Sequence, residues 1–231
     1  MIRRSLALLL FCFATLCRAA DPAAASPCTA VDVAPARLAR DEHGGTMKID
    51  RCYRYADRTG DFRLYLLATF DRQDVDDTLS SSLAAQLFRK QPDGTLVQQW
   101  VIHDRIEPGE AGARFSKTLI EFRDLDGDGT LTPILVLRFV PFERGGDGPV
   151  DDTAFSGRLK FILFHGGAKV AIRAVTGMLD DERHTTASDS FFELPRQQQL
   201  WLQKKMRTLS HEGLFTFDDV GDYRPRREKH R

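Results

Sequence analysis

Residues 133–142 (PILVLRFVPF) constrain the fold of this chain more than any other segment, because they are apolar almost without interruption. Such a run predicts a central strand that is buried on both faces. A strand of this kind needs a layer of protein on each of its two sides, so the rest of the chain has to supply both layers.

Shorter segments before and after this run predict further strands, because their apolar residues alternate or cluster between turn residues. They are 47–55, 62–70, 83–90, 95–103, 115–123, 159–165 and 169–176. Pro92-Asp93-Gly94 joins two of them as a hairpin turn, since Pro fixes φ and Gly accepts a positive φ. Gly166-Gly167 joins another pair as a hairpin. The pattern gives about seven or eight strands.

A helix is expected only in the C-terminal part of the chain. Pro195 suits the first turn of a helix, where its missing N–H group costs nothing. The short apolar face of this helix would consist of Leu194, Leu200 or Trp201, and Met206 or Leu209. Strands joined by short turns and followed by one late helix predict an α+β, β-rich fold: a mostly antiparallel sheet or sandwich with one C-terminal helix.

The N-terminus has the pattern of a secretory signal peptide over residues 1–19. Arg3 and Arg4 supply positive charge, Leu6–Leu16 is an apolar run, and Cys17-Arg18-Ala19 offers small residues for cleavage. The pattern predicts a periplasmic or secreted protein.

Two other interpretations of the N-terminus were weighed. A transmembrane anchor needs about 20 apolar residues, and Arg18 ends the run too early. A lipoprotein needs a small residue before the modified cysteine, whereas Cys12 follows Phe11 and Cys17 follows Leu16. We therefore expect no transmembrane anchor after cleavage.

Composition divides the remaining chain into three parts. Residues 20–45 are rich in Ala, Pro and Gly and predict a flexible arm. Residues 46–217 predict a single β-rich domain, and residues 218–231 predict a disordered charged tail.

The overall composition is that of a soluble globular protein, because hydrophobic residues make up 42% and charged residues 29%. The 33 basic residues balance the 33 acidic residues, which argues against nucleic acid as the main partner.

Cys28 and Cys52 are the pair of cysteines that remains after cleavage. In an oxidising compartment an even pair predicts a disulfide, here one that ties the arm to the first strand. A reactive thiol is the alternative. No further ligands are grouped with the two cysteines, so they match no zinc motif.

One acidic loop has the residue spacing of a metal-binding site. Residues 124–132 (DLDGDGTLT) place three carboxylates in alternation, and Ca²⁺ prefers such oxygen ligands. The loop begins as an EF-hand loop does, but its twelfth position is Leu135 rather than Glu, and its expected flanks are strands. The predicted calcium ligands are Asp124, Asp126, Asp128, Thr130 and Thr132, with a structural role for the ion.

The same loop is similar to the calcium loops of integrin-type β-propeller blades, in which the ninth position is Asp. Here Thr132 stands at that position, which removes one negative charge and should weaken binding. The alternative is a tight, Gly-rich turn without metal, in which Asp side chains accept hydrogen bonds from backbone N–H groups.

Other arrangements predict no catalytic residue. His165-Gly166-Gly167 has no G-x-S-x-G partner motif, so a hairpin turn accounts for it better than an oxyanion loop. The acidic pairs Asp151-Asp152 and Asp180-Asp181 are typical of solvated loops. Trp100 and Trp201 are interpreted as core residues rather than as a platform for sugars.

The order of these features resembles a family of small exported bacterial proteins labelled surface polysaccharide biosynthesis proteins. The resemblance rests on the leader, the acidic loop before a buried strand, the hairpin ending Lys169–Arg173, and Phe191–Pro195 leading into a helix with Leu200 and Trp201. It covers about residues 50–207. It implies a place in the cell envelope and carries no catalytic residue.

The leading hypothesis is therefore a non-enzymatic, exported envelope protein that binds a surface polysaccharide or another envelope protein. An enzyme acting on envelope polysaccharide is the first alternative, with loop carboxylates as its acid and base. A periplasmic inhibitor or immunity protein is the second, with residues 71–82 or 143–156 as the protruding loop.

Overall fold

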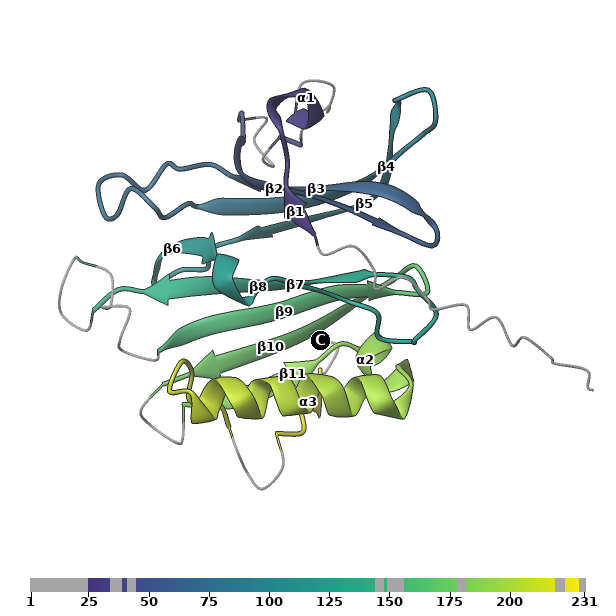
Figure 1. The fold of residues 1–231 in the computed structure, drawn as a ribbon. Coiled ribbons are helices and arrows are strands. Elements are labelled where there is room, and N and C mark those ends of the chain that lie inside the picture. Colours follow the sequence, from purple (N-terminus) through teal and green to yellow (C-terminus); the bar gives the residue numbers. More distant parts are fainter. Residues whose placement is uncertain are drawn as a thin grey trace, which may run out of the picture.

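The computed structural model describes residues 25–33, 39–40, 45–143, 148, 156–177, 182–218 and 223–228. In these residues two β-sheets are stacked face to face, and a long C-terminal helix covers the outer face of the second sheet (Figure 1). The prediction of an α+β, β-rich sandwich of mostly antiparallel strands with a C-terminal helix is confirmed. Two layers of protein therefore cover the second sheet, one on each face.

The first sheet has the order β1-β2-β3-β4-β5 among the described residues. Its strands are β1 (Ser26–Pro27), β2 (Lys48–Asp57), β3 (Gly60–Ala68), β4 (Ser82–Lys90) and β5 (Leu96–Arg105). All neighbours are antiparallel, and the turn at Pro92-Asp93-Gly94 joins β4 to β5 as predicted. Gly94 has a φ of +88° there, which glycine adopts without strain.

The second sheet has the order β12-β11-β10-β9-β8-β6, with β7 also paired to β8. Its strands are β6 (Glu110–Phe115), β7 (Glu121–Arg123), β8 (Thr132–Pro141), β9 (Gly157–His165), β10 (Ala168–Thr176), β11 (His184–Ala187) and β12 (Arg226–Arg227). The β11–β12 pair is parallel and the others are antiparallel. Gly166-Gly167 forms the β9–β10 hairpin turn that the sequence predicts.

Strand β8 lies inside this sheet and is buried from Pro133 to Val140, as its apolar run predicts. Leu135, Leu137 and Phe139 pack toward the first sheet with Leu64 and Leu66. Ile134 and Val136 belong to a second core on the opposite side, which includes Leu202 and Met206 of the helix. The run is continuous because each face of the strand meets a different apolar layer.

The prediction of one strand over 115–123 is wrong. The segment contains the end of β6, a single 3₁₀ turn η1 (Lys117–Leu119) and β7. Phe115 pairs with Leu137 and Glu121 with Ile134, and the Ser116 N–H group still donates to the Val136 carbonyl at 2.8 Å, so residues 117–120 bulge away from the edge of β8. The Leu119 N–H group donates to the Ser116 carbonyl at 2.9 Å and closes this turn. Alternation in the sequence cannot reveal such a bulge, because polar residues are found both on the exposed face of a continuous strand and in a bulged segment.

Two helices occupy the C-terminal region, α2 (Asp189–Glu193) and α3 (Arg196–His211). Helix α3 begins directly after Pro195, as predicted. Its buried face contains Leu202, Met206 and Leu209. Of the two alternatives Leu200 and Trp201, Trp201 is the one that packs against this core. Leu200 is 45% exposed, because the 3.6-residue period places it on the opposite side from Leu202.

The described part of the N-terminal arm is ordered against the first sheet, whereas residues 20–45 were predicted to be flexible. Strand β1 pairs with β2, and the short helix α1 (Ala30–Val33) follows it. Arg63 on β3 donates to Asp32 at 2.6 Å, and both side chains are buried. Ordering a Pro- and Ala-rich arm costs chain entropy. The disulfide and this ion pair offset that cost.

The described part of the tail also differs from the prediction of disorder over residues 218–231. Strand β12 pairs with β11, and Arg227 forms an ion pair with Asp189. Local composition favours disorder, but the open side of β11 supplies hydrogen-bond partners to this segment.

Residues 1–24, which include the predicted signal peptide over residues 1–19, lie outside the described residues. Among the residues that are described, no helix is both long enough and apolar enough to span a membrane.

Candidate functional site

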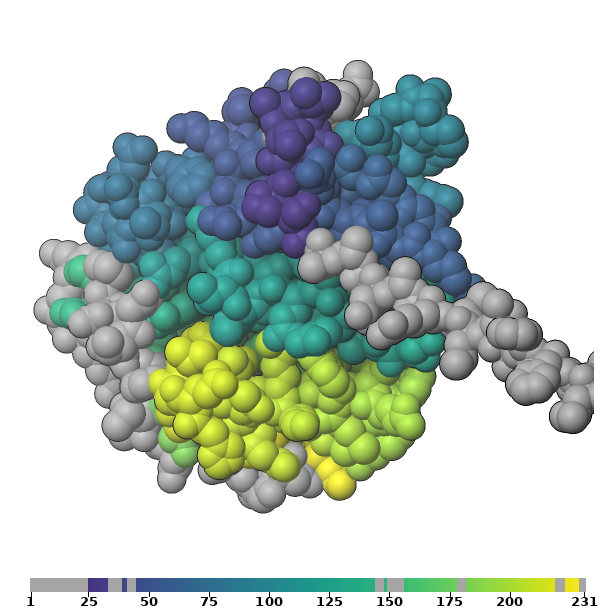
Figure 2. Space-filling view, viewed as in Figure 1, coloured from purple at the N-terminus to yellow at the C-terminus, as the bar shows by residue number. Residues whose placement is uncertain are grey.

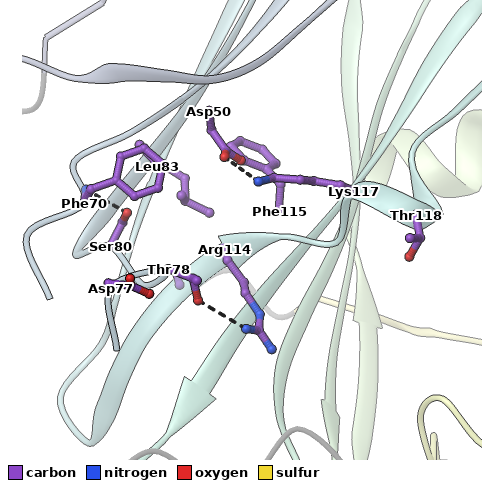
Figure 3. Close-up of a pocket in the computed structure, with 12 residues that line it drawn as sticks. Asp50, Phe70, Asp77, Thr78, Ser80, Leu83, Arg114, Phe115, Lys117 and Thr118 are labelled. Atoms are coloured by element: carbon purple, nitrogen blue, oxygen red, sulfur yellow. Dashed lines mark hydrogen bonds and ion pairs between the residues drawn. The ribbon is translucent and has the colours of Figure 1, made fainter. Parts of the chain in front are cut away.

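A pocket of about 380 Å³ opens between the two sheets at one end of the sandwich (Figure 3). Strands β2, β3 and β4 supply one wall, β6 and η1 supply the facing wall, and the β3–β4 connection closes one end. The lining residues are Asp50, Ala68, Phe70, Asp77, Thr78, Ser80, Leu83, Ala113, Arg114, Phe115, Lys117 and Thr118. Its volume falls within the roughly 300–1,000 Å³ of small-molecule sites.

Charged groups of both signs form the rim of this pocket. Lys117 on η1 donates to Asp50 on β2 at 2.6 Å, so the pair bridges the two sheets. Figure 3 shows these two side chains pointing toward each other, and Arg114 pointing toward Thr78. Arg114 Nη1 lies 3.4 Å from Thr78 Oγ1. Asp77 adds an exposed carboxylate beside them, so two acidic and two basic groups surround the opening.

The floor of the pocket is apolar. Phe70, Leu83 and Phe115 line it together with Ala68 and Ala113. Leu83 and Phe115 are buried, whereas Phe70 is half-buried. Apolar rings below a charged rim create a surface that contacts carbon atoms and polar atoms of one ligand at the same time.

The β3–β4 connection is held firmly against the second sheet, although it was predicted as a polar loop over 71–82. Ser80 and Ala113 exchange backbone hydrogen bonds of 3.0 and 2.8 Å, and Leu79 is buried. Phe70 has a φ of +50°, and its N–H group donates to Ser80 Oγ at 2.9 Å. A non-glycine residue in this left-handed region costs about 1–2 kcal/mol. The wall of the pocket is thus strained locally and fixed by these contacts.

Asp71 anchors the two ends of this connection. Its carboxylate accepts hydrogen bonds from Thr69 Oγ1 at 2.6 Å and from the Ser81 N–H group at 2.7 Å. Partial burial acts to raise the pKa of Asp71, but the hydrogen bonds from Ser81 and Thr69 outweigh it and hold the pKa below its ordinary value. The ionised Asp71 side chain therefore holds the two ends of the β3–β4 connection together through these hydrogen bonds.

The predicted metal loop forms a hydrogen-bonded turn. Asp124 accepts from the N–H groups of Asp128 at 3.1 Å and Gly129 at 2.8 Å. Asp128 accepts from the N–H group of Thr130 at 2.8 Å, and this bond is the main cause that lowers its pKa. Thr132 begins strand β8 opposite Arg123. These bonds have the pattern of the metal-free turn that the sequence left open as an alternative.

The three carboxylates of the loop face different partners. Asp128 pairs with Arg58 at 2.9 Å, and Asp126 accepts a hydrogen bond from Gln198 of α3, with His165 Nδ1 at 3.6 Å. Asp124 accepts its hydrogen bonds from backbone N–H groups of the turn. Among the described residues, no group of three or more His, Cys, Asp or Glu side chains is arranged to hold a metal ion. The carboxylate oxygens of Asp124, Asp126 and Asp128, in this arrangement, do not converge on one Ca²⁺ ion. Calcium binding by the loop stays a prediction.

The loop nevertheless connects three parts of the fold. The Leu131 N–H group donates to Asp57 at 2.9 Å, and the Arg58 N–H group donates to the Gly129 carbonyl at 3.0 Å. These bonds fasten the loop to the β2–β3 hairpin, while Gln198 fastens it to α3. The loop therefore joins the first sheet, the second sheet and the helix through these contacts.

The other predicted residues have clear places. Cys28 and Cys52 form a disulfide with a Cα–Cα distance of 5.3 Å, which confirms the pairing. Trp100 stacks on Phe164 with ring centroids 4.4 Å apart, between the two sheets. The acidic pairs at 151–152 and 180–181 lie outside the described residues.

Sequence reasoning missed the pocket. Asp50, Asp77, Arg114 and Lys117 are far apart in the chain and belong to no motif. No local signal singles them out, because Asp50 and Lys117 lie inside predicted strands, Arg114 directly precedes one, and Asp77 lies in the polar stretch between two. Nothing in the sequence shows that the four residues meet.

No protein-family model, curated protein or solved structure matches this chain. The resemblance to surface polysaccharide biosynthesis proteins therefore stays a prediction, and the function has to be argued from the site.

Proposed function

We propose that this protein is exported and acts in the cell envelope as a non-enzymatic binding domain for surface polysaccharide, with one sugar unit seated in the pocket between the sheets. The observation that carries the proposal is the pocket itself, a charged rim above an apolar floor. Sugars present C–H groups on their ring faces and hydroxyl groups at their edges, so they match both parts of such a surface.

The balance of charge favours a ligand rich in hydroxyl groups. Asp77 accepts hydrogen bonds, Arg114 and Lys117 donate them, and Thr78 and Thr118 can do both, while Asp50 is engaged with Lys117. A strongly anionic ligand would be repelled by the carboxylates, and a strongly cationic ligand by the basic groups. A sugar hydroxyl both donates and accepts, so it can use the acceptors and the donors that the rim exposes.

The N-terminal segment and the disulfide support export. The leader over residues 1–19 has the features of a secretory signal, and disulfides persist mainly in oxidising compartments. Intact mass of material recovered from the periplasm or medium tests this part: the proposal requires loss of the first 19 residues.

An enzyme acting on envelope polysaccharide is the second candidate, because two carboxylates line the same pocket. Asp50 is engaged with Lys117 and its side chain is only 9% exposed, so it is poorly placed to give a proton to a substrate. Release of reducing ends from a bound polysaccharide would favour the enzyme, and its absence with binding intact would favour the binding domain.

The binding experiment is a titration against an array of bacterial surface oligosaccharides one to six sugars long. Asp77→Asn removes charge at the rim, and we expect it to weaken binding about tenfold, as for a lost hydrogen bond to a charged group. Asp74→Asn is the matched control, since Asp74 is exposed in the same connection but does not line the pocket. Equal effects of the two substitutions, or no binding to any glycan, would overturn the proposal.

A further inference from the structure

A second hollow of about 280 Å³ lies between helix α3 and the segment from η1 to β7. Its lining residues are Leu119, Glu121, Arg123, Trp201, Lys204, Lys205, Thr208, Leu209 and Glu212. Like the first pocket it combines an aromatic side chain with acidic and basic groups. From the sequence, Trp201 and Leu209 are candidates for the apolar face of the helix, and Trp201 is interpreted as a core residue rather than as a platform for sugars. In the structure Trp201 is only partly buried against the second core.

One stripe of helix α3 supplies most of this hollow. Trp201, Lys204, Lys205, Thr208 and Glu212 follow one another at spacings of one to four residues and share one side of the helix. The core-facing side of the same helix contains Leu202 and Met206 instead. Lys204, Thr208 and Glu212 of this stripe are exposed, whereas Trp201 also packs against the second core and Lys205 is paired with Glu121 of the edge strand β7.

Trp201 is half-buried and held by charged neighbours. Lys205 Nζ lies 6.0 Å from the centre of its ring, and Lys205 also pairs with Glu121 on β7. Glu121 accepts a second bond from Arg123 at 2.8 Å. A ring held by such a network loses little entropy on binding, which suits it to stack against a sugar face.

The two hollows lie on opposite sides of the turn η1. Lys117 and Thr118 line the first pocket, whereas the next residue, Leu119, lines the second. Consecutive Cα atoms are about 3.8 Å apart, so a single exposed turn separates the hollows. Figure 2 shows the teal part of the chain, which includes this turn, between the purple N-terminal segment and helix α3 on one face of the molecule.

We infer that the hollow at Trp201 is a second sugar-binding subsite and that one polysaccharide chain passes over η1 to occupy both hollows. The inference rests on the proposed function and extends it, because it makes a linear glycan, not a single sugar, the full ligand. A linear glycan fits because its repeating units carry the same mixture of apolar faces and hydroxyl groups to each hollow. A single small molecule cannot fill two hollows that are separated by a ridge.

The test uses the full protein and the same glycan array, with two measurements. In a Trp100→Phe background, Trp201 is the one remaining tryptophan of the chain, so its fluorescence reports on the second hollow alone. We expect oligosaccharides to quench or shift this fluorescence and to bind about tenfold more tightly than the matching monosaccharide. Trp201→Ala should reduce the affinity for the oligosaccharide to that for the monosaccharide and leave the monosaccharide affinity unchanged.

Lys204→Ala is a second variant, because Lys204 is exposed and its loss should not impair folding. We expect this substitution to weaken binding of the oligosaccharide and to leave binding of the monosaccharide unchanged. If Asp77→Asn weakens binding while changes at Trp201 and Lys204 have no effect, the second subsite is wrong and the proposed function stands. If no glycan binds, both are wrong.

Discussion

Lys117 Nζ lies 2.6 Å from Asp50 Oδ1, and this ion pair joins the turn η1 of the second sheet to strand β2 of the first. The Asp50 side chain is only 9% exposed, whereas Lys117 is 39% exposed. The pair thus contains one carboxylate that depends on its partner for solvation and one ammonium group that still reaches water.

Replacing Lys117 by Met should therefore destabilise the fold by about 1–3 kcal/mol, the cost of leaving a largely buried polar group without its partner. Urea unfolding measures this loss. The Lys117→Arg variant keeps the positive charge, so its free energy of unfolding should fall much less. The double variant with Asp50→Asn should recover part of the stability, and an additive double-mutant cycle would show that the two residues do not interact.

Reduction of the Cys28–Cys52 disulfide should release the described arm from the first sheet. The bond closes a loop with a sequence separation of 24 residues, and the chain-entropy model gives about 3 kcal/mol for such a loop. The double variant Cys28→Ser, Cys52→Ser should lose a similar amount in urea unfolding. Two titratable thiols in the non-reduced protein would contradict the disulfide.

The stability should also fall in acid because of Asp32. Burial acts to raise the pKa of Asp32, but hydrogen bonds from Thr29 and the Arg63 guanidinium lower it from 3.8 to about 2. The carboxylate binds protons more weakly in the folded state than in the unfolded state. Its contribution to stability is therefore present above pH 3.8 and is lost as the pH falls toward 2.

Asp32→Asn tests this dependence. Wild type should be more stable than this variant near neutral pH, and the difference should shrink between about pH 4 and pH 2. Urea unfolding at a series of pH values measures it. A difference that stays constant over this range would show that another group dominates the acid sensitivity.

Calcium binding by the acidic loop requires Asp128 to turn away from Arg58. Arg58→Gln removes the competing positive charge, so we expect Ca²⁺ to raise the melting temperature of this variant more than that of wild type. Calorimetry and thermal unfolding with Ca²⁺ or EGTA provide the measurement. No heat and no shift for either protein would remove the metal proposal and leave the loop as a hydrogen-bonded junction.

The sequence predicted most strands because each strand carries its own periodicity. In the run 133–142, Leu135, Leu137 and Phe139 face the first sheet, and Ile134 and Val136 face the core under helix α3. Pro195 and the Gly-Gly and Pro-Asp-Gly turns are local signals of the same kind. The predictions failed or stayed open where two structures are compatible with one sequence pattern, as in the bulge between β6 and β7 or the choice between Leu200 and Trp201 for the apolar helix face.

The sequence by itself determined the β-rich, mostly antiparallel class and the start of the late helix, because these depend on local spacing, and it indicated the pairing of Cys28 with Cys52, because they are the cysteines that remain after the predicted cleavage. Only the tertiary structure decided that Asp50, Asp77, Arg114 and Lys117 surround one pocket, and that Arg58 and Gln198 turn the acidic loop's carboxylates apart. The physical reason is that periodicity fixes which face a side chain occupies. The partner that it meets across the sandwich depends on how whole sheets and the helix pack against one another.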